Sequence, residues 1–202
     1  MSQPEHFEML ILGSGEGGKY LAWHMAKSGY RTAVVERKLI GGSCPNTNCL
    51  PSKNEIWSAK VADLVHHADR FGMITGSVRT DMKKVLARKR EMVDGLIALH
   101  LELYKASGAE LIMGAGRFIA PKTIEVSLND GGTRVLTGDR VAINIGTRAT
   151  IPEVPGLAAA TQSPERPRHI HRIAAGAPSL SSRPCPFERP HALSALRTAG
   201  AR

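Results

Sequence analysis

The segment from Phe7 to Glu36 constrains the fold more than any other part of the sequence. An apolar run at residues 7–12 ends in the sequence Gly13-Ser14-Gly15-Glu16-Gly17-Gly18. Residues 17–28 carry apolar side chains at helical spacing and stop before Gly29, and residues 32–35 form a second apolar run. Two buried strands joined by a helix through short connections predict a parallel, right-handed β-α-β unit. The expected fold class is therefore α/β, with a parallel Rossmann-like sheet.

The glycines between the first strand and the helix match the pattern G-x-G-x-x-G at Gly13, Gly15 and Gly18. In this context the first glycine allows a tight turn, the second lets a pyrophosphate approach the backbone, and the third allows close helix–strand packing. Glu36 follows Gly18 by 18 residues, at the end of the second strand, where a carboxylate can accept a hydrogen bond from a ribose hydroxyl. The pattern predicts a dinucleotide site; the alternative is a glycine-rich turn without a ligand.

Residues 41–146 are expected to form two long helices followed by short strands. A loop at residues 41–46 leads into a helix expected at residues 49–68, and a second long helix is expected at residues 81–107. From Glu110 onward, short extended pieces separated by turns predict a small antiparallel meander, with Gly138-Asp139 as a turn before a strand at residues 140–146 that rejoins the central sheet.

Two cysteines, Cys44 and Cys49, flank the start of the first long helix. A helix N-terminus favours the reactive thiolate, and two thiols this close can form a readily reduced disulfide. The alternatives are half of a metal site or two inert buried cysteines. The third cysteine, Cys185, lies far away near the C-terminus, so no second ligand pair supports a metal and none is expected.

The formal net charge of +9 does not predict nucleic-acid binding. Residues 161–202 contain seven arginines and two acidic residues and so carry five of the nine excess charges, without the aromatic interleaving of a nucleic-acid surface. No apolar run approaches the roughly 18–20 residues that span a bilayer, and the first ten residues do not resemble a secretory signal. These features predict a cytoplasmic protein that binds neither nucleic acid nor membrane.

The cysteine segment carries a specific resemblance. Residues 41–53, GGSCPNTNCLPSK, resemble the G-G-T/S-C-x-N-x-G-C-x-P-S-K signature of the class I pyridine nucleotide-disulfide oxidoreductases. These are flavoenzymes whose members include dihydrolipoyl dehydrogenase and mercuric reductase. Residues 145–148 and 151–156 resemble the family's A-T-G-S/A-x-P…P-x-x-P-G segment. One departure is Asn48, where the family usually has glycine; asparagine tolerates a positive φ better than most residues.

The resemblance implies FAD as cofactor, NAD(P)H as electron donor, and a disulfide or other small acceptor. It implies that Cys49 faces the flavin and that Cys44 exchanges with substrate. Lys53, one helical turn beyond Cys49, is expected beside the flavin N5. The other implied cofactor-binding residues are Gly13, Gly15, Gly18 and Glu36 for adenosine and pyrophosphate, Gly42 and Ser43 at the flavin end, Gly116 at the adenine end, and Gly146 and Thr147 near the cofactor.

The resemblance stops near residue 160, so the expected organisation is an incomplete FAD-binding domain at residues 1–160 and a disordered tail at residues 161–202. The tail holds six of the 12 prolines and no lysine, a composition expected of a frameshift; a genuine disordered extension is the alternative. The family's NAD(P)H-binding domain and its dimer-interface domain, which carries a His-x-x-x-x-Glu base, have no counterpart in the sequence. The expected function is electron transfer from NAD(P)H through FAD to a Cys44/Cys49 disulfide, here truncated; the resemblance implies the family's homodimer, which the missing interface domain makes doubtful for this chain. The alternative is an inactive flavin-binding or thiol-bearing fragment.

Overall fold

The computed structural model describes residues 3–147 and residue 155. The described residues form two compact units: the first comprises residues 3–46 and 94–147, and the second comprises residues 47–93. The expected tail at residues 161–202 lies outside the described residues, as does the segment at 151–156 except for Pro155. The expected division of the chain at residue 160 therefore stays a prediction.

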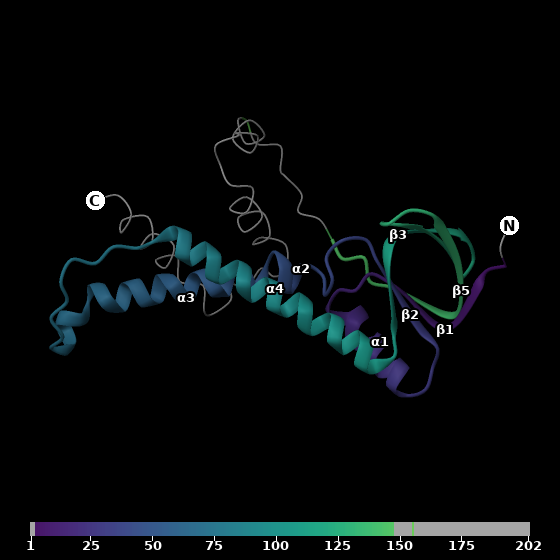
Figure 1. Ribbon diagram of the computed structural model, residues 1–202, viewed down its shortest axis with the longest axis horizontal. Coiled ribbons are helices and arrows are strands. Elements are labelled where there is room, and N and C mark those ends of the chain that lie inside the picture. Colours follow the sequence, from purple (N-terminus) through teal and green to yellow (C-terminus); the bar gives the residue numbers. More distant parts are fainter. Residues whose placement is uncertain (1–2, 148–154, 156–202) are drawn as a thin grey trace. The chain divides into compact units, whose positions relative to one another are not determined.

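Five strands build the described part of the first unit. They are β1 (Glu5–Leu12), β2 (Thr32–Glu36), β3 (Glu110–Ala120), β4 (Thr123–Leu128) and β5 (Thr133–Ile143). β1 pairs in parallel with both β2 and β5, β2 pairs in parallel with β3, and β4 pairs antiparallel with β3 and β5. The strands thus close into a ring in the order β1-β2-β3-β4-β5 (Figure 1). The α/β fold, the parallel β-α-β unit, the meander and the return of the last strand beside β1 are confirmed.

Four helices and one short 3-10 helix accompany the strands in the described residues. They are α1 (Glu16–Lys27), α2 (Ser43–Asn46), α3 (Cys49–His66), η1 (Ala68–Phe71) and α4 (Met82–Ser107). The expected helices agree with α1, α3 and α4 within about two residues at each end. The segment expected as a loop at residues 41–46 contains α2 instead, because Pro45 is buried and the side-chain amide of Asn46 closes the turn on the Gly42 carbonyl at 2.7 Å.

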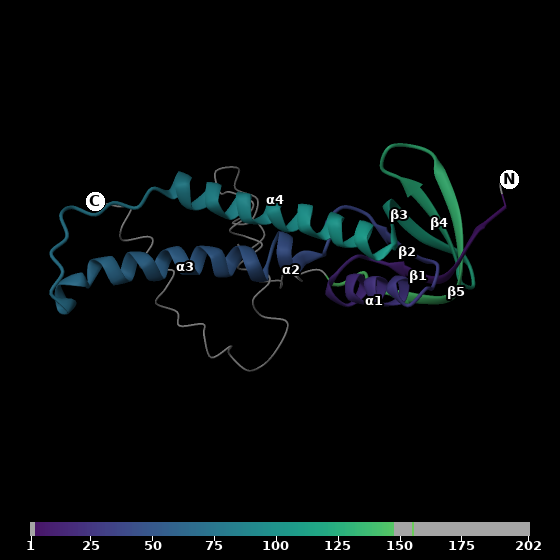
Figure 2. The same cartoon turned by 60° about the horizontal axis from the view of Figure 1, so that its bottom comes forward.

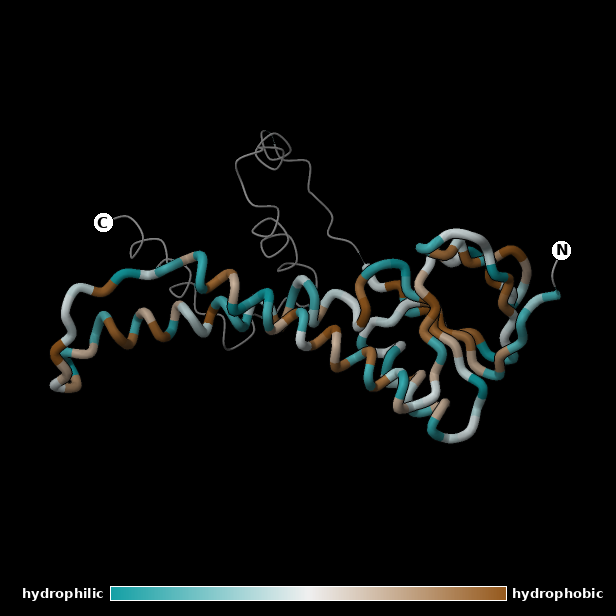
Figure 3. The backbone as a smooth tube through the Cα atoms, viewed as in Figure 1, coloured by the Kyte–Doolittle hydropathy of each residue, from teal (hydrophilic) through white to brown (hydrophobic). Residues whose placement is uncertain are grey.

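Both faces of the central strands are buried, which explains why β1 and β2 are apolar without alternation. Leu10 and Val35 belong to a cluster inside the strand ring, whereas Ile11 and Val34 belong to a second cluster with residues of α1 and α4. The apolar stretches of β1 and β2 lie next to each other in Figure 3. All four side chains are at most 1% exposed, and each contributes roughly 1.5–3 kcal/mol through burial.

The prediction of a turn at Gly138-Asp139 was wrong, because both residues lie inside β5. Gly138 pairs with Phe7 of β1, and a Cβ atom at this position would lie 2.9 Å from the Cβ of Leu10. The glycine is therefore required by close packing of two strands rather than by a change of direction.

The second unit consists of α3, η1 and the first half of α4. Figures 1 and 2 both show α3 beside this half of α4. Lys89 of α4 forms an ion pair with Glu55 of α3, and Arg88 donates hydrogen bonds to the Asn54 carbonyl and the Ser58 hydroxyl. None of the helices in the described part of the chain is long and apolar enough to cross a bilayer.

Candidate flavin and dithiol site

The turn from β1 to α1 has the geometry expected of a dinucleotide-binding glycine fingerprint. Gly13 has a φ of 101°, and a Cβ on Gly18 would lie only 2.2 Å from the Gly13 carbonyl oxygen. No residue other than glycine fits either position without displacement of the turn. The helix begins at the cap residue Gly15 with no side-chain cap, so the first amides of α1 point outward without a side-chain acceptor. Such amides, at the positive end of the helix dipole, form an anion-binding position.

The carboxylate of Glu36 lies beside this turn and accepts four hydrogen bonds from the chain. Its Oε2 accepts from the backbone N and the hydroxyl of Ser14, at 3.0 and 2.7 Å. Its Oε1 accepts from the amides of Lys38 and Leu39, at 2.7 and 2.9 Å. Burial opposes ionisation of this carboxyl, but the hydrogen bonds outweigh it and hold the pKa of Glu36 below its ordinary value of 4.5. The carboxylate is therefore an ionised acceptor, and a ribose hydroxyl would share one of its oxygens with the donors already bound there.

Ser14 also connects the fingerprint to the segment that carries Cys44. Its hydroxyl is fully buried and accepts a hydrogen bond from the amide of Gly41 at 3.0 Å. Gly42 has a φ of 78°, and a Cβ there would lie 2.6 Å from the Cα of Gly15. The glycine pair 41–42 is therefore needed because the backbone passes directly over the fingerprint.

The two cysteines are placed by consecutive helices. Cys44 lies in α2 and is half-buried, whereas Cys49 is the first residue of α3 and is exposed. The loop before α2 is closed by Asn46, whose side-chain amide donates to the carbonyls of Ile40 and Gly42 at 2.8 and 2.7 Å. Lys53 lies one turn after Cys49 on α3 and is exposed. The spacing of four residues puts Cys49 and Lys53 on the same face of the helix.

The remaining expected site residues lie at three positions of the first unit. Ser43 begins α2 and is exposed. Gly116 lies in β3, where a Cβ would meet the side chains of Leu12 and Ile124 at 2.7 and 3.0 Å, so packing inside the strand ring already requires a glycine there. Gly146 and Thr147 follow β5 and are exposed, with a φ of 68° at Gly146.

Four residues at or beside the turn were missed by sequence reasoning: Ser14, Lys19, His100 and Asn144. Asn144 follows β5, and its side-chain amide donates to the Gly13 carbonyl at 3.3 Å. Asn144 could have been predicted from the sequence, because a polar amide directly after an apolar strand is typical of a residue that contacts a neighbouring turn. Lys19 and His100 are buried polar residues on otherwise apolar helix faces, and their periodic positions could have indicated them.

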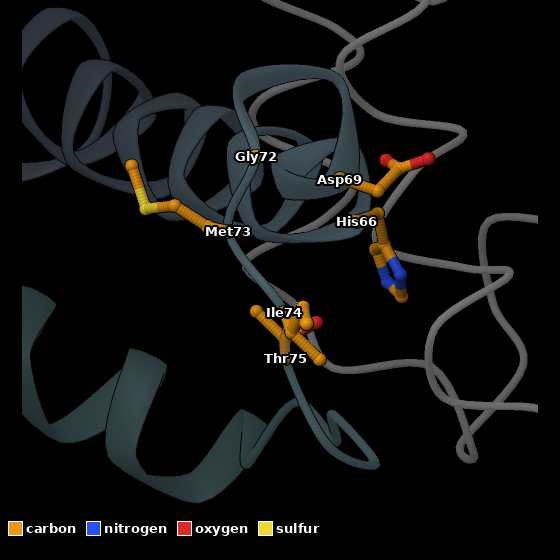
Figure 4. Close-up of a pocket in the computed structure, with 6 residues that line it drawn as sticks. All are labelled: His66, Asp69, Gly72, Met73, Ile74 and Thr75. Carbon is orange, nitrogen blue, oxygen red and sulfur yellow. The ribbon is translucent and has the colours of Figure 1, made fainter.

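A surface pocket in the second unit is lined by His66, Asp69, Gly72, Met73, Ile74 and Thr75 (Figure 4). It lies where η1 leads into the connection to α4, and neither a cysteine nor a fingerprint glycine lines it. We therefore do not assign it to the cofactor. In the described part of the chain, no three His, Cys, Asp or Glu side chains are grouped as metal ligands.

Residues 7–177, which include the glycine turn, Glu36 and both cysteines, match the model of the family described as pyridine nucleotide-disulphide oxidoreductase, and the chain belongs to this family. A dihydrolipoyl dehydrogenase from Bacillus subtilis is 35% identical over 159 residues, which cover 75% of this chain and 33% of the relative. A dihydrolipoyl dehydrogenase from Mycobacterium bovis is 37% identical over 155 residues, covering 75% of this chain and 32% of the relative.

A solved structure of RclA from Escherichia coli, described as an HOCl-induced flavoprotein disulfide reductase in complex with Cu(II), has a TM-score of 0.63 and 26% identity. The match covers 75% of this chain and 31% of that chain. The chain thus spans about one third of the length of these relatives. Family membership implies FAD as the cofactor, and the residues present fit it: uncapped amides at α1 suit the pyrophosphate, and the ionised Glu36 suits the ribose.

Proposed function

We propose that this chain is the FAD-binding, dithiol-bearing part of an oxidoreductase that takes electrons from NAD(P)H and reduces a disulfide or another small acceptor. The observation that carries the proposal is the hydrogen-bonded continuity from the fingerprint to the thiol segment. Ser14 bonds to both Glu36 and Gly41, and Gly41 lies three residues before Cys44. The segment expected to hold the cofactor and the segment that bears a thiol are thus one packed element.

The chain's own residues have separate tasks in this function. The α1 amides and Glu36 bind and orient the cofactor, and the glycines allow its close approach. When bound, FAD supplies the route by which two electrons, delivered as hydride from NAD(P)H, reach the cysteine pair. Reduction of a Cys44–Cys49 disulfide consumes two electrons and two protons and gives two thiols. We assign Cys49 to the flavin side and Cys44 to exchange with the acceptor, with Lys53 near the flavin.

The same geometry supports a second candidate, in which this chain binds flavin and carries the thiols but does not turn over by itself. The chain spans about one third of the length of these relatives. Hydride transfer needs the nicotinamide held against the flavin, and orientation of this kind contributes roughly 7–11 kcal/mol to lowering a barrier. The family homodimer and a cytoplasmic location stay predictions.

One experiment tests the dithiol assignment directly. The purified chain is oxidised in air, alkylated, digested and analysed by mass spectrometry, then treated with a mild dithiol and analysed again. We expect a Cys44–Cys49 disulfide that reopens with dithiol, while Cys185 stays alkylated throughout. A Cys44–Cys185 link as the main species would refute the assignment. A steady-state assay with NADH, NADPH and added FAD then separates the two candidates, with the Cys44→Ser/Cys49→Ser variant as the control for thiol-dependent turnover.

A further inference from the structure

The imidazole of His100 on α4 packs directly against the loop that leads to Cys44. Gly41 has a φ of 85°, and a Cβ there would lie 2.8 Å from both Cε1 and Nδ1 of His100. The same Cβ would lie 3.0 Å from Cγ of Pro45, the residue after Cys44. The imidazole ring therefore packs against the Gly41–Pro45 segment at Gly41. All of these residues belong to the first unit.

His100 in turn is held by a buried lysine. The residue is 6% exposed, and its Nε2 lies 3.0 Å from Nζ of Lys19, which is 3% exposed. Lys19 Nζ also donates to Oε1 of Glu16 at 2.8 Å. The imidazole stacks on Trp23 of α1, with ring centroids 5.9 Å apart and an interplanar angle of 26°. The ring is thus fixed from two sides by α1.

The Lys19 contact determines which nitrogen of His100 carries the proton. A lysine ammonium has three donors and no acceptor, so Nε2 must accept, and the ring is neutral with its proton on Nδ1. Nδ1 has no hydrogen-bond partner among the described residues and lies on the side of the ring that faces Gly41.

The groups that face His100 define its response to pH. From α1 these are Lys19 and Glu16; the contacting atoms of the loop belong to Gly41 and Pro45, which do not titrate; and on α4 itself Tyr104 lies one turn further along. Burial, and next the charge of Lys19, lower the pKa of His100, while Glu16 opposes them. A protonated ring could not accept from Lys19 and would place two cations about 3.0 Å apart in a buried position.

We propose that His100 and Lys19 are positioning residues for the loop that carries Cys44, acting through the contact of the imidazole with Gly41. Lys19 keeps the ring in the acceptor form and in the stacked orientation, and the ring keeps the Gly41–Pro45 segment closed on the fingerprint. Protonation of His100 breaks the hydrogen bond, displaces the ring and loosens the segment, which makes Cys44 more accessible. The effect of His100 protonation on turnover rests on the proposed function. Its effect on the accessibility of Cys44 does not.

The test measures how fast Cys44 is alkylated, relative to Cys49, as the pH falls. The full chain is reduced, desalted and treated briefly with iodoacetamide at pH values from 7.5 down to 5, and the two modified peptides are quantified by mass spectrometry. The ratio of wild type to variant at each pH cancels the ionisation of the thiols themselves. No flavin or pyridine nucleotide is present, so failure of the electron-transfer proposal does not affect the result.

Three variants give the comparison. His100→Gln retains an acceptor for Lys19 and does not titrate, so its Cys44/Cys49 ratio should match wild type at pH 7.5 and fall below it by at least about threefold near pH 5. His24→Gln, at an exposed position on α1, should follow wild type at every pH. His100→Ala should raise the ratio already at pH 7.5. Identical pH profiles for wild type and His100→Gln would overturn the proposal, even if His100→Ala does not fold.

Discussion

Ser14 donates two hydrogen bonds to a single oxygen of Glu36, one from its backbone N at 3.0 Å and one from its hydroxyl at 2.7 Å. The same hydroxyl accepts from the Gly41 amide at 3.0 Å. The buried hydroxyl oxygen of Ser14 therefore joins the fingerprint turn, the acidic residue at the end of β2 and the loop before Cys44.

Replacement of this hydroxyl should destabilise the first unit. Ser14→Ala leaves the Gly41 amide without its acceptor and removes one donor from Glu36. Because an unsatisfied buried polar group costs about 1–3 kcal/mol, we expect a loss of that size in the free energy of unfolding. Urea unfolding monitored by circular dichroism measures it. The control is Ser28→Ala, which removes an exposed hydroxyl that donates to the His24 carbonyl and should cost less than about 0.5 kcal/mol.

Two glycine-to-alanine changes in helices should have opposite effects. A Cβ at Gly18 would lie 2.2 Å from the Gly13 carbonyl oxygen, so Gly18→Ala should displace α1, destabilise the protein by about 1–3 kcal/mol and weaken FAD binding. A Cβ at Gly95 in α4 would meet no described atom within 4 Å outside its own helix backbone, so Gly95→Ala should stabilise the protein by roughly 0.5–1 kcal/mol. Urea unfolding and the quenching of FAD fluorescence measure both. Equal FAD affinity in the two variants would contradict the assignment of the fingerprint.

Glu36 should contribute to the acid sensitivity of the fold. Because the pKa of Glu36 is lower in the folded protein than its ordinary 4.5, the unfolded chain binds more protons in this range. Its stabilising contribution is therefore complete above about pH 4.5 and is lost as the pH falls through the folded value. Glu36→Gln should be less stable than wild type at pH 7, and the difference should shrink between pH 5 and pH 3. A difference that does not vary with pH would show that the carboxylate charge plays no part.

The ion pair between Lys89 and Glu55 allows a test in the second unit. Their side chains are 11% and 23% exposed, so removal of one partner leaves the other charge partly buried. We expect Lys89→Met alone to cost about 1.5–3 kcal/mol and the double variant Lys89→Met/Glu55→Leu to recover most of this loss. Thermal unfolding of both variants provides the measurement. A double variant less stable than the single variant would mean that the pair is not a coupled unit.

Local signals were sufficient for the β-α-β unit and the long helices, because continuous apolar strands, a glycine turn and helical periodicity all act within about 30 residues. They were insufficient for Gly138, where a glycine-aspartate pair typical of turns is required instead by close packing against Leu10. They also missed the Lys19–His100 pair, since 81 residues separate its members and only the folded unit brings them together. Within the site, the cofactor-binding roles of the glycines and Glu36 stay predictions, and sequence reasoning missed Ser14 because its contacts lie 22 and 27 residues away.

The closed order of the five strands has a consequence for association between molecules. Each of the strands described pairs with two others, so over the doubly paired segments no row of backbone amides and carbonyls is open to a strand of another chain, whereas residues 114–120 of β3 lie beyond its register with β2 and pair only with β4. This protection depends on β4, which pairs antiparallel with both β3 and β5. Detachment of β4 would free one side of each of those two strands and create a template for aggregation.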